Sequence, residues 1–178
     1  MAQHNLLVTG LPGTGKTTLI ARLIQRLEGV RTAGFYTEEL RVGGVRKGFE
    51  IVDFRGERLL LSHVDIRGGQ RVGRYGVDVA RFERYLESVP FLSAHTDLVI
   101  IDEIGKMECL SAKFRYLVVD LLDAPVMMVA TIAFYGGGII QDIKDRADVR
   151  LYRVTKDNRD SLAGEIEKDV REGLAQRT

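Results

Sequence analysis

Residues 10–17 of the chain, Gly-Leu-Pro-Gly-Thr-Gly-Lys-Thr, combine three glycines with a lysine and a hydroxyl residue directly after an apolar run. Their spacing matches the phosphate-binding loop (P-loop) at every defined position. The glycines let backbone N–H groups turn toward phosphates, Lys16 adds a charge near the β- and γ-phosphates, and the Thr17 hydroxyl suits a Mg²⁺ ligand. A helix that begins at Lys16 adds its positive dipole, so the segment predicts nucleotide binding.

A second candidate group, Asp102 and Glu103, ends the apolar run Leu98–Ile101. Such a carboxylate pair after a P-loop is the Walker B pattern, in which Asp102 would hold Mg²⁺ beside Thr17. Glu103 would then lie near the γ-phosphate and orient or deprotonate an attacking water. Taken alone, the pair also fits the acidic start of a helix, and it is the preceding P-loop that favours the metal site.

The long separation of the two motifs leaves room for at least one strand between them in the chain. A glutamate directly after the aspartate indicates the RecA-like branch of P-loop proteins, in which a further strand lies between the two motif strands in the sheet. The next apolar strand would bring the Thr131 hydroxyl near the γ-phosphate as a sensor of the attacking water. A β-branched residue that simply suits a strand is the alternative explanation.

Phosphoryl transfer also calls for positive charge beyond Lys16 and Mg²⁺. A cation supplied by the same chain could come from a turn after Glu103 or from the start of a helix. Most exposed lysine and arginine side chains are simply solvated, so each candidate has this alternative explanation. The candidates are Lys106, Arg115 and Arg159.

Apolar runs over 6–8, 98–101 and 126–132 lack polar alternation, as expected for strands of a parallel sheet covered on both faces. Helix-compatible stretches follow them at 16–28, 111–122 and 139–145. A shorter strand at 151–154 leads into a last helix at 157–174, with Thr155 or Asp157 as its N-cap. This alternation predicts an α/β fold, a three-layer domain with a mostly parallel sheet.

The segment 34–77 differs from the rest of the chain. Short strand-like pieces at 34–40, 48–54 and 58–61 are separated by turn signals at 43–44 and 55–57. They predict an antiparallel β-meander inserted into the α/β core without a hydrophobic core of its own. A helix over 77–88 follows, and the whole chain, 1–178, is expected to form a single P-loop domain.

The composition is that of an ordinary globular protein, with 45% hydrophobic and 29% charged residues and a formal net charge of +1. This balance gives no general attraction to nucleic acid or membrane. Cys109 is the only cysteine, which excludes an intrachain disulfide, favours a reducing compartment and predicts a small packed side chain. His4, His63 and His95 are scattered and indicate no ligand cluster.

No apolar run approaches the ~20 residues of a membrane span, and the first strand begins too early to leave room for a signal peptide. We therefore expect a cytoplasmic protein without a membrane partner. The sequence is compatible with a monomer and does not define the oligomeric state.

Several segments resemble the thermophile-type nucleoside-triphosphatase family, over nearly the whole chain. The most specific match is Asp102–Glu108, Asp-Glu-Ile-Gly-Lys-Met-Glu. The loop 133–138, Ala-Phe-Tyr-Gly-Gly-Gly, departs from the family, whose members tend to carry a proline there and later a histidine-proline. The other similar segments are 10–18, 33–39, 47–49, 73–77, 130–132 and 154–159.

The resemblance implies a RecA-like fold and Mg²⁺-dependent hydrolysis of nucleoside triphosphates (ATP, GTP, CTP and UTP) to diphosphate and phosphate. The predicted catalytic residues are Lys16, Glu103 and Thr131, and the predicted Mg²⁺ ligands are Thr17 and Asp102. Predicted nucleotide contacts are Gly10, Leu11, Pro12, Gly13, Thr14, Gly15, Lys16, Thr17, Thr18, Asp102, Glu103, Gly105, Lys106 and Arg159.

Two other functions stay open on the sequence. A P-loop kinase for a small molecule or nucleic acid would use an acceptor hydroxyl in place of water. Its Arg-rich lid is not evident, and only Lys144 and Arg146 could serve as one. A nucleotide-regulated binding module would offer the 34–77 meander to a protein or RNA.

Overall fold

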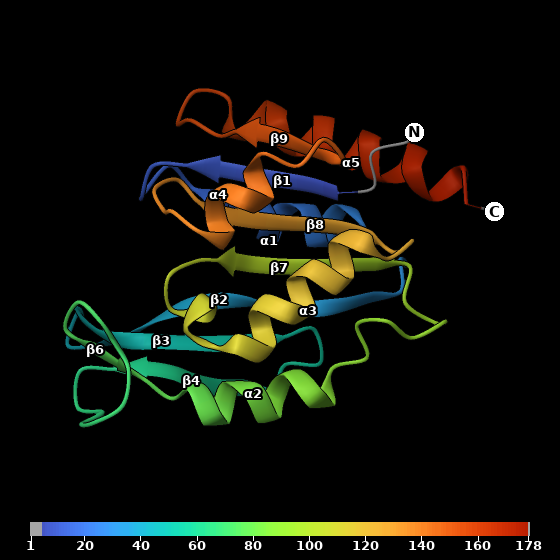
Figure 1. Ribbon diagram of the computed structural model, residues 1–178. Coiled ribbons are helices and arrows are strands. Elements are labelled where there is room, and N and C mark those ends of the chain that lie inside the picture. Colours follow the sequence, from blue (N-terminus) through green and yellow to red (C-terminus); the bar gives the residue numbers. More distant parts are fainter. Residues whose placement is uncertain (1–4, 178) are drawn as a thin grey trace.

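The computed structural model describes residues 5–177, in which strands and helices alternate as expected of an α/β protein (Figure 1). Along the chain the elements are β1 (Asn5–Gly10), α1 (Lys16–Arg26), β2 (Thr32–Val42), β3 (Val45–Asp53), β4 (Arg58–His63), β5 (Arg71–Val72), β6 (Tyr75–Val77), α2 (Val79–Ser88), β7 (Leu98–Ile104), the 3-10 turn η1 (Glu108–Leu110), α3 (Ala112–Asp123), β8 (Met127–Ala133), α4 (Ile139–Lys144), β9 (Val149–Arg153) and α5 (Arg159–Ala175).

The strands form one sheet in the order β5-β6-β4-β3-β2-β7-β8-β1-β9. Strands β2, β7, β8, β1 and β9 run parallel, whereas β3, β4, β6 and β5 continue the sheet in antiparallel fashion. Strand β8 lies between β1 and β7, as predicted for the RecA-like branch. The carboxyl ends of these three strands therefore meet at one edge, which brings the P-loop and the Asp102–Glu103 pair together.

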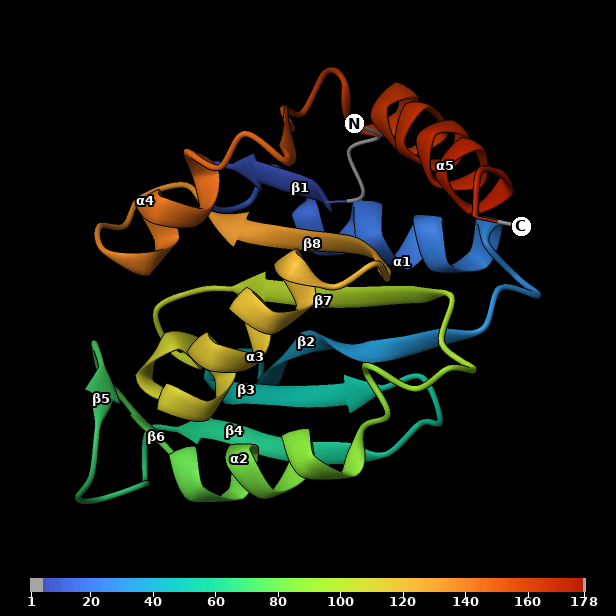
Figure 2. The same cartoon turned by 45° about the vertical axis from the view of Figure 1, so that its right-hand side comes forward.

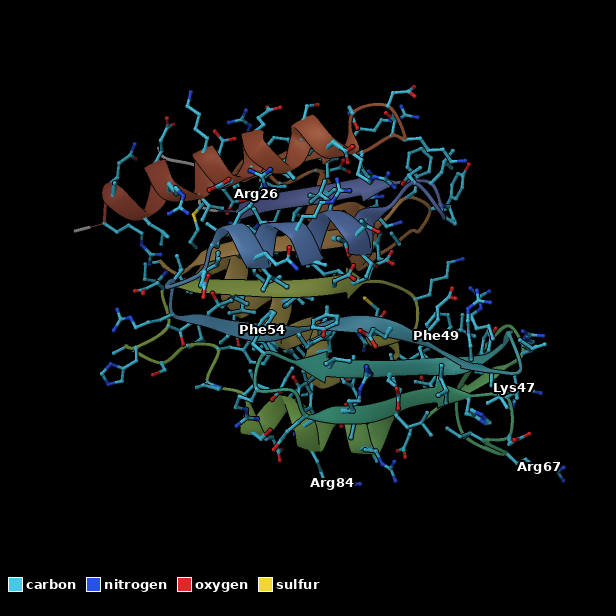
Figure 3. The ribbon with its side chains drawn as sticks, turned by 180° about the vertical axis from the view of Figure 1, so that it is seen from behind. Arg26, Lys47, Phe49, Phe54, Arg67 and Arg84 are labelled. Carbon is cyan, nitrogen blue, oxygen red and sulfur yellow. The ribbon has the colours of Figure 1, made fainter. Side chains whose placement is uncertain are left out.

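Helices cover the sheet on both faces, which confirms the predicted three-layer arrangement. Alternate residues of the parallel strands enter two different cores. In β1, Leu7 packs with the core under α2, α3 and α4, whereas Leu6 and Val8 pack with the core under α1 and α5. Seen from behind, α1 and α5 cover only the half of the sheet near Arg26, and β2 to β4 near Phe54 lie outside this helical layer (Figure 3).

Strand β2 belongs to both halves of the sheet. Its residues 32–35 pair in parallel with β7, and 35–42 pair in antiparallel fashion with β3. At Gly34, φ is 130° and a Cβ would come within 1.8 Å of the Ile100 carbonyl oxygen, so only glycine permits this close approach. The meander expected at 34–77 is therefore a continuation of the main sheet, and no sharp boundary lies at residue 34. Phe35, Ile51 and Leu61 belong to the core under α2, α3 and α4.

The last helix begins later than predicted, and its predicted N-cap is wrong. α5 starts at Arg159 with Asn158 as N-cap, instead of Thr155 or Asp157. The Thr155 hydroxyl accepts a hydrogen bond from the Asn158 amide (3.3 Å), and the Thr155 amide donates to the Asn158 side chain (2.7 Å). These bonds close a loop before the helix. Among the described helices, none has the length and apolar character needed to cross a bilayer.

Candidate nucleotide-binding site

The P-loop connects β1 to α1 and closes on itself. The Thr14 amide and hydroxyl both donate to the Leu11 carbonyl, at 3.2 Å and 2.8 Å. Gly13 and Gly15 have φ values of 78° and 98°, in the left-handed region that favours glycine. Gly15 is the N-cap of α1 and provides no side-chain cap, so the amides of the first helical turn are left for an anionic ligand.

Lys16 reaches back across this loop from the first position of α1. Its Nζ donates to the Gly10 carbonyl at 3.0 Å, so the ammonium group bridges the two ends of the loop. Gly10 is buried, whereas the other predicted phosphate contacts of the loop are accessible to a ligand. Leu11, Pro12, Gly13, Thr17 and Thr18 are exposed, and Thr14, Gly15 and Lys16 are partly exposed.

Asp102 lies at the centre of a hydroxyl network near the end of β7. Its carboxylate accepts hydrogen bonds from Thr17 Oγ1, at 2.8 Å, and from the Thr131 hydroxyl. The Thr37 hydroxyl of β2 donates to the Asp102 main-chain carbonyl. Elements α1 and β8 thus fix the carboxylate, and β2 fixes the main chain of Asp102, which is only 1% exposed.

The electrostatics of Asp102 reflect this burial. Loss of water raises the pKa of the carboxyl, and the hydrogen bonds from Thr131 and Thr17 and the charge of Lys16 oppose that rise. Thr131 is fully buried and directs its hydroxyl at Asp102. In this geometry it holds the carboxylate in place, and the direct γ-phosphate contact predicted for Thr131 stays a prediction.

Glu103 follows at the edge of the sheet and is partly exposed. Burial raises the pKa of its carboxyl, the charges of Lys16 and Lys144 oppose this effect, and the charge of Asp102 adds to it. Gly105 lies beside this side chain, where a Cβ would be in ordinary contact with Glu103 at 3.5 Å. A direct nucleotide contact of Gly105 stays a prediction.

Glu108 is a buried acid that the sequence motif contained but to which we assigned no role. Its side chain lies beside Gly105, where a Cβ would come within 2.9 Å of Glu108 Oε2. Burial raises the pKa of Glu108 to about 8, and the negative charges of Glu103 and Asp102 add to the shift. Glu103 and the deeply buried Glu108 therefore both interact electrostatically with Asp102, the predicted metal ligand.

Replacing Glu108 with glutamine is expected to flatten the pH dependence of stability. The pKa of Glu108 in the folded state lies above its unfolded value of about 4.3. The contribution of this group to stability is therefore complete below pH 4 and is lost as the pH rises to about 8. Glu108→Gln removes this loss. The free energy of unfolding is measured in urea without nucleotide at pH 5 and at pH 8. We expect its decrease over this range to be smaller in the variant than in the wild type, by at least about 1 kcal/mol.

Glu28→Gln, at an exposed position of the same protein, is the matched control and should leave the wild-type pH profile unchanged. An equal pH slope for the wild type and Glu108→Gln would contradict the raised pKa of Glu108.

The three predicted cations lie in different surroundings. Arg159, at the start of α5, lies against the P-loop, where a Cβ on Gly15 would come within 2.5 Å of its Cδ. Lys106 is exposed on the turn after β7. Arg115 donates through Nη1 to the Cys109 carbonyl at 2.6 Å, so its guanidinium group stabilises the turn before α3.

Lys144 and Arg146, which the sequence offers only as a weak lid, also differ in their surroundings. Arg146 pairs with Asp123 at 2.6 Å and Asp148 at 2.7 Å, and these ion pairs occupy its guanidinium group. Lys144, in contrast, interacts electrostatically with Glu103. Partial burial lowers the pKa of Lys144, and the charges of Glu103 and Asp145 oppose that shift. The sequence pattern does not predict this interaction between Lys144 and Glu103.

Cys109 and two of the three histidines lie within the described residues. Cys109 packs partly buried against the main core, and burial raises the pKa of its thiol to about 12, so the thiolate is disfavoured. His63 accepts a hydrogen bond from the Asp65 amide, and His95 is exposed. His4 lies outside the described residues. Within residues 5–177, no group of three His, Cys, Asp or Glu side chains is arranged to hold a metal ion.

The chain is similar in sequence to known nucleoside-triphosphatases. A protein-family model described as NTPase matches residues 5–167. Nucleoside-triphosphatase THEP1 of Thermotoga sp. (strain RQ2) is 43% identical over 162 residues, which cover 90% of this chain and 92% of the relative. The cancer-related nucleoside-triphosphatase of Homo sapiens is 40% identical over 182 residues, with 93% and 95% covered.

Solved structures give the same result. The crystal structure of THEP1 from Aquifex aeolicus superposes with a TM-score of 0.79 at 36% identity, covering 91% of this chain and 96% of the other. The solution structure of the human nucleoside triphosphatase superposes with a TM-score of 0.78 at 38% identity, with 94% and 97% covered. The described fold is therefore the fold of these P-loop proteins.

Proposed function

The chain belongs to the NTPase family, and from this premise we propose that it cleaves the β–γ phosphoanhydride of ATP, GTP, CTP and UTP with the help of Mg²⁺. That the protein is a nucleoside-triphosphatase follows from its family. The substrate range, the metal and the roles of individual residues are the parts we propose. The observation that carries them is the convergence of a P-loop with a buried Asp102 and a neighbouring Glu103 at one sheet edge.

We propose that the P-loop binds the triphosphate through its backbone amides and Lys16. The exposed loop residues and the uncapped first turn of α1 support this role, because they offer several N–H donors to one anion. Lys16 would exchange its hydrogen bond to Gly10 for the β- and γ-phosphates. Arg159 lies beside Gly15, where the loop amides would hold the α- and β-phosphates, and would add a second cation there.

The donor set around Asp102 fits Mg²⁺. A hydroxyl and a carboxylate meet there at 2.8 Å, and hard oxygen donors are what Mg²⁺ prefers. Mg²⁺ in nucleotide sites keeps waters and phosphate ligands and needs only one or two protein ligands, so a cluster of three acids is not required. Thr17 and Asp102 would hold the ion, and Thr131 would keep the carboxylate oriented. Bound there, the ion would offset phosphate charge.

In the proposed reaction, Glu103 accepts a hydrogen bond from a water molecule and directs its oxygen at the γ-phosphorus. A bond forms between that oxygen and the phosphorus while the bond from phosphorus to the β–γ bridging oxygen breaks. The water gives up a proton to the Glu103 carboxylate, and the nucleoside diphosphate leaves with the electron pair of the broken bond. The partly exposed position of Glu103 next to buried Asp102 supports this role, since water can reach it.

We expect the purified protein to release phosphate from ATP, GTP, CTP and UTP at similar rates, within about tenfold of one another, without any acceptor. The expectation follows from a phosphate-centred site, in which no recognisable guanine-reading motif selects the base. Released phosphate is measured with and without Mg²⁺, and EDTA should abolish the release. A kinase would be nearly inert under these conditions, and dependence on an added hydroxyl acceptor would contradict the proposal.

A further inference from the structure

Lys144 is the last residue of α4, and its amine is anchored at the nucleotide edge of the sheet. Its Nζ donates to the Phe134 carbonyl, directly after β8, at 2.9 Å. In Figure 2, α4 lies beside the ends of β1 and β8. In the glycine loop before α4, Gly136 packs against the helix, and a Cβ there would come within 2.8 Å of Ile140 Cδ1. This hydrogen bond fixes the ammonium group at the end of β8.

Lys16 and Lys144 belong to helices on opposite faces of the sheet. Lys16 begins α1, which covers one face, and Lys144 ends α4, whose apolar residues pack into the core of the other face. Glu103 interacts electrostatically with both ammonium groups. The Glu103 carboxylate, which we propose to direct the attacking water, therefore interacts electrostatically with two cations.

The other basic residues considered for this role are less well placed. Arg115 and Arg146 are committed to the Cys109 carbonyl and to two aspartates, respectively. Arg159 lies beside Gly15, where the P-loop meets the α- and β-phosphates. Lys106 is exposed on its turn.

We infer that Lys144 is a further catalytic residue of this site, whose ammonium group contacts the γ-phosphoryl oxygens during hydrolysis. The inference rests on the proposed function. As the bond to the bridging oxygen breaks, negative charge is spread over the γ-phosphoryl oxygens, and a cation that is already in place stabilises this charge without reorganisation. Lys144 thereby supplies from within the chain a cation that many P-loop enzymes receive from an arginine.

The test compares Lys144→Gln with Lys144→Arg. Glutamine keeps an N–H donor for the Phe134 carbonyl but removes the charge, whereas arginine keeps both. We expect Lys144→Gln to lower kcat for ATP about 10²-fold, the usual effect of losing one transition-state donor, and Lys144→Arg to recover most of it. Binding of ADP alone should change less than about threefold, but the extra affinity for ADP with Mg²⁺ and fluoroaluminate, which mimics the transferring phosphoryl group, should be lost.

Lys113→Gln is the matched control, because Lys113 is exposed and pairs with Glu87 on the surface. Retention of kcat and of fluoroaluminate affinity in Lys144→Gln would overturn the inference, as would a rise in KM with unchanged kcat. The ratio of affinities with and without fluoroaluminate is read on folded protein that binds ADP, so a loss of stability does not obscure it. Absence of phosphate release by the wild type would instead overturn the proposed function.

Discussion

Glu103→Gln is expected to bind ATP normally and to hydrolyse it about 10³-fold more slowly, which is within the usual contribution of a general base. Glutamine has the same size but cannot accept the proton of the attacking water. The substitution also removes a negative charge close to the phosphates, so the Kd for ATP should stay within about threefold of the wild-type value or become tighter. The kcat from phosphate release and the Kd from calorimetry give the two numbers.

The split between kcat and Kd separates catalysis from structure. Glu172→Gln, at an exposed position of α5, is the control and should leave both values unchanged. Turnover by Glu103→Gln within about threefold of the wild type would remove Glu103 from the mechanism. A parallel loss of ATP binding would point to a damaged site, because the proposed mechanism assigns the Glu103 carboxylate to the attacking water.

The sequence predicted the P-loop well because every residue of the motif has a local reason. Glycines at 13 and 15 adopt positive φ, and Lys16 begins the helix directly behind them. The neighbouring order β7-β8-β1 also followed from local information, namely apolar strands without polar alternation and a glutamate directly after Asp102. These features need only a few consecutive residues to specify them.

Several contacts that the sequence did not predict depend on segments that are distant in the chain. Strand β2 pairs with β7 because Gly34 allows close approach to Ile100, and a glycine alone indicated only a turn or a strand end. Lys144 donates to the Phe134 carbonyl across the glycine loop, and its ammonium group interacts electrostatically with Glu103. Thr131 was placed at the correct strand end, but its hydroxyl bonds to Asp102.

Lys16→Ala is expected to have the largest effect of any single substitution, because it weakens both binding and catalysis. Truncating one member of a close charge pair costs about 2–5 kcal/mol, so the Kd for ATP should rise about 10²-fold or more. The same charge stabilises the γ-phosphoryl group in the transition state, and its loss should lower kcat by a further factor of about 10². Together these losses should reduce kcat/KM about 10⁴-fold.

Calorimetry with Mg²⁺ and ATP, and phosphate release at saturating ATP, measure these two losses separately. Lys168→Ala, on the exposed side of α5, is the control and should behave as wild type. The alanine variant should remain folded, since Lys16 makes its hydrogen bond only to the Gly10 carbonyl at the ligand edge of the sheet. Tight ATP binding by folded Lys16→Ala would mean that the P-loop does not hold the triphosphate. The roles proposed for Asp102, Glu103 and Lys144 would then also fail, because each assumes a triphosphate bound at the P-loop.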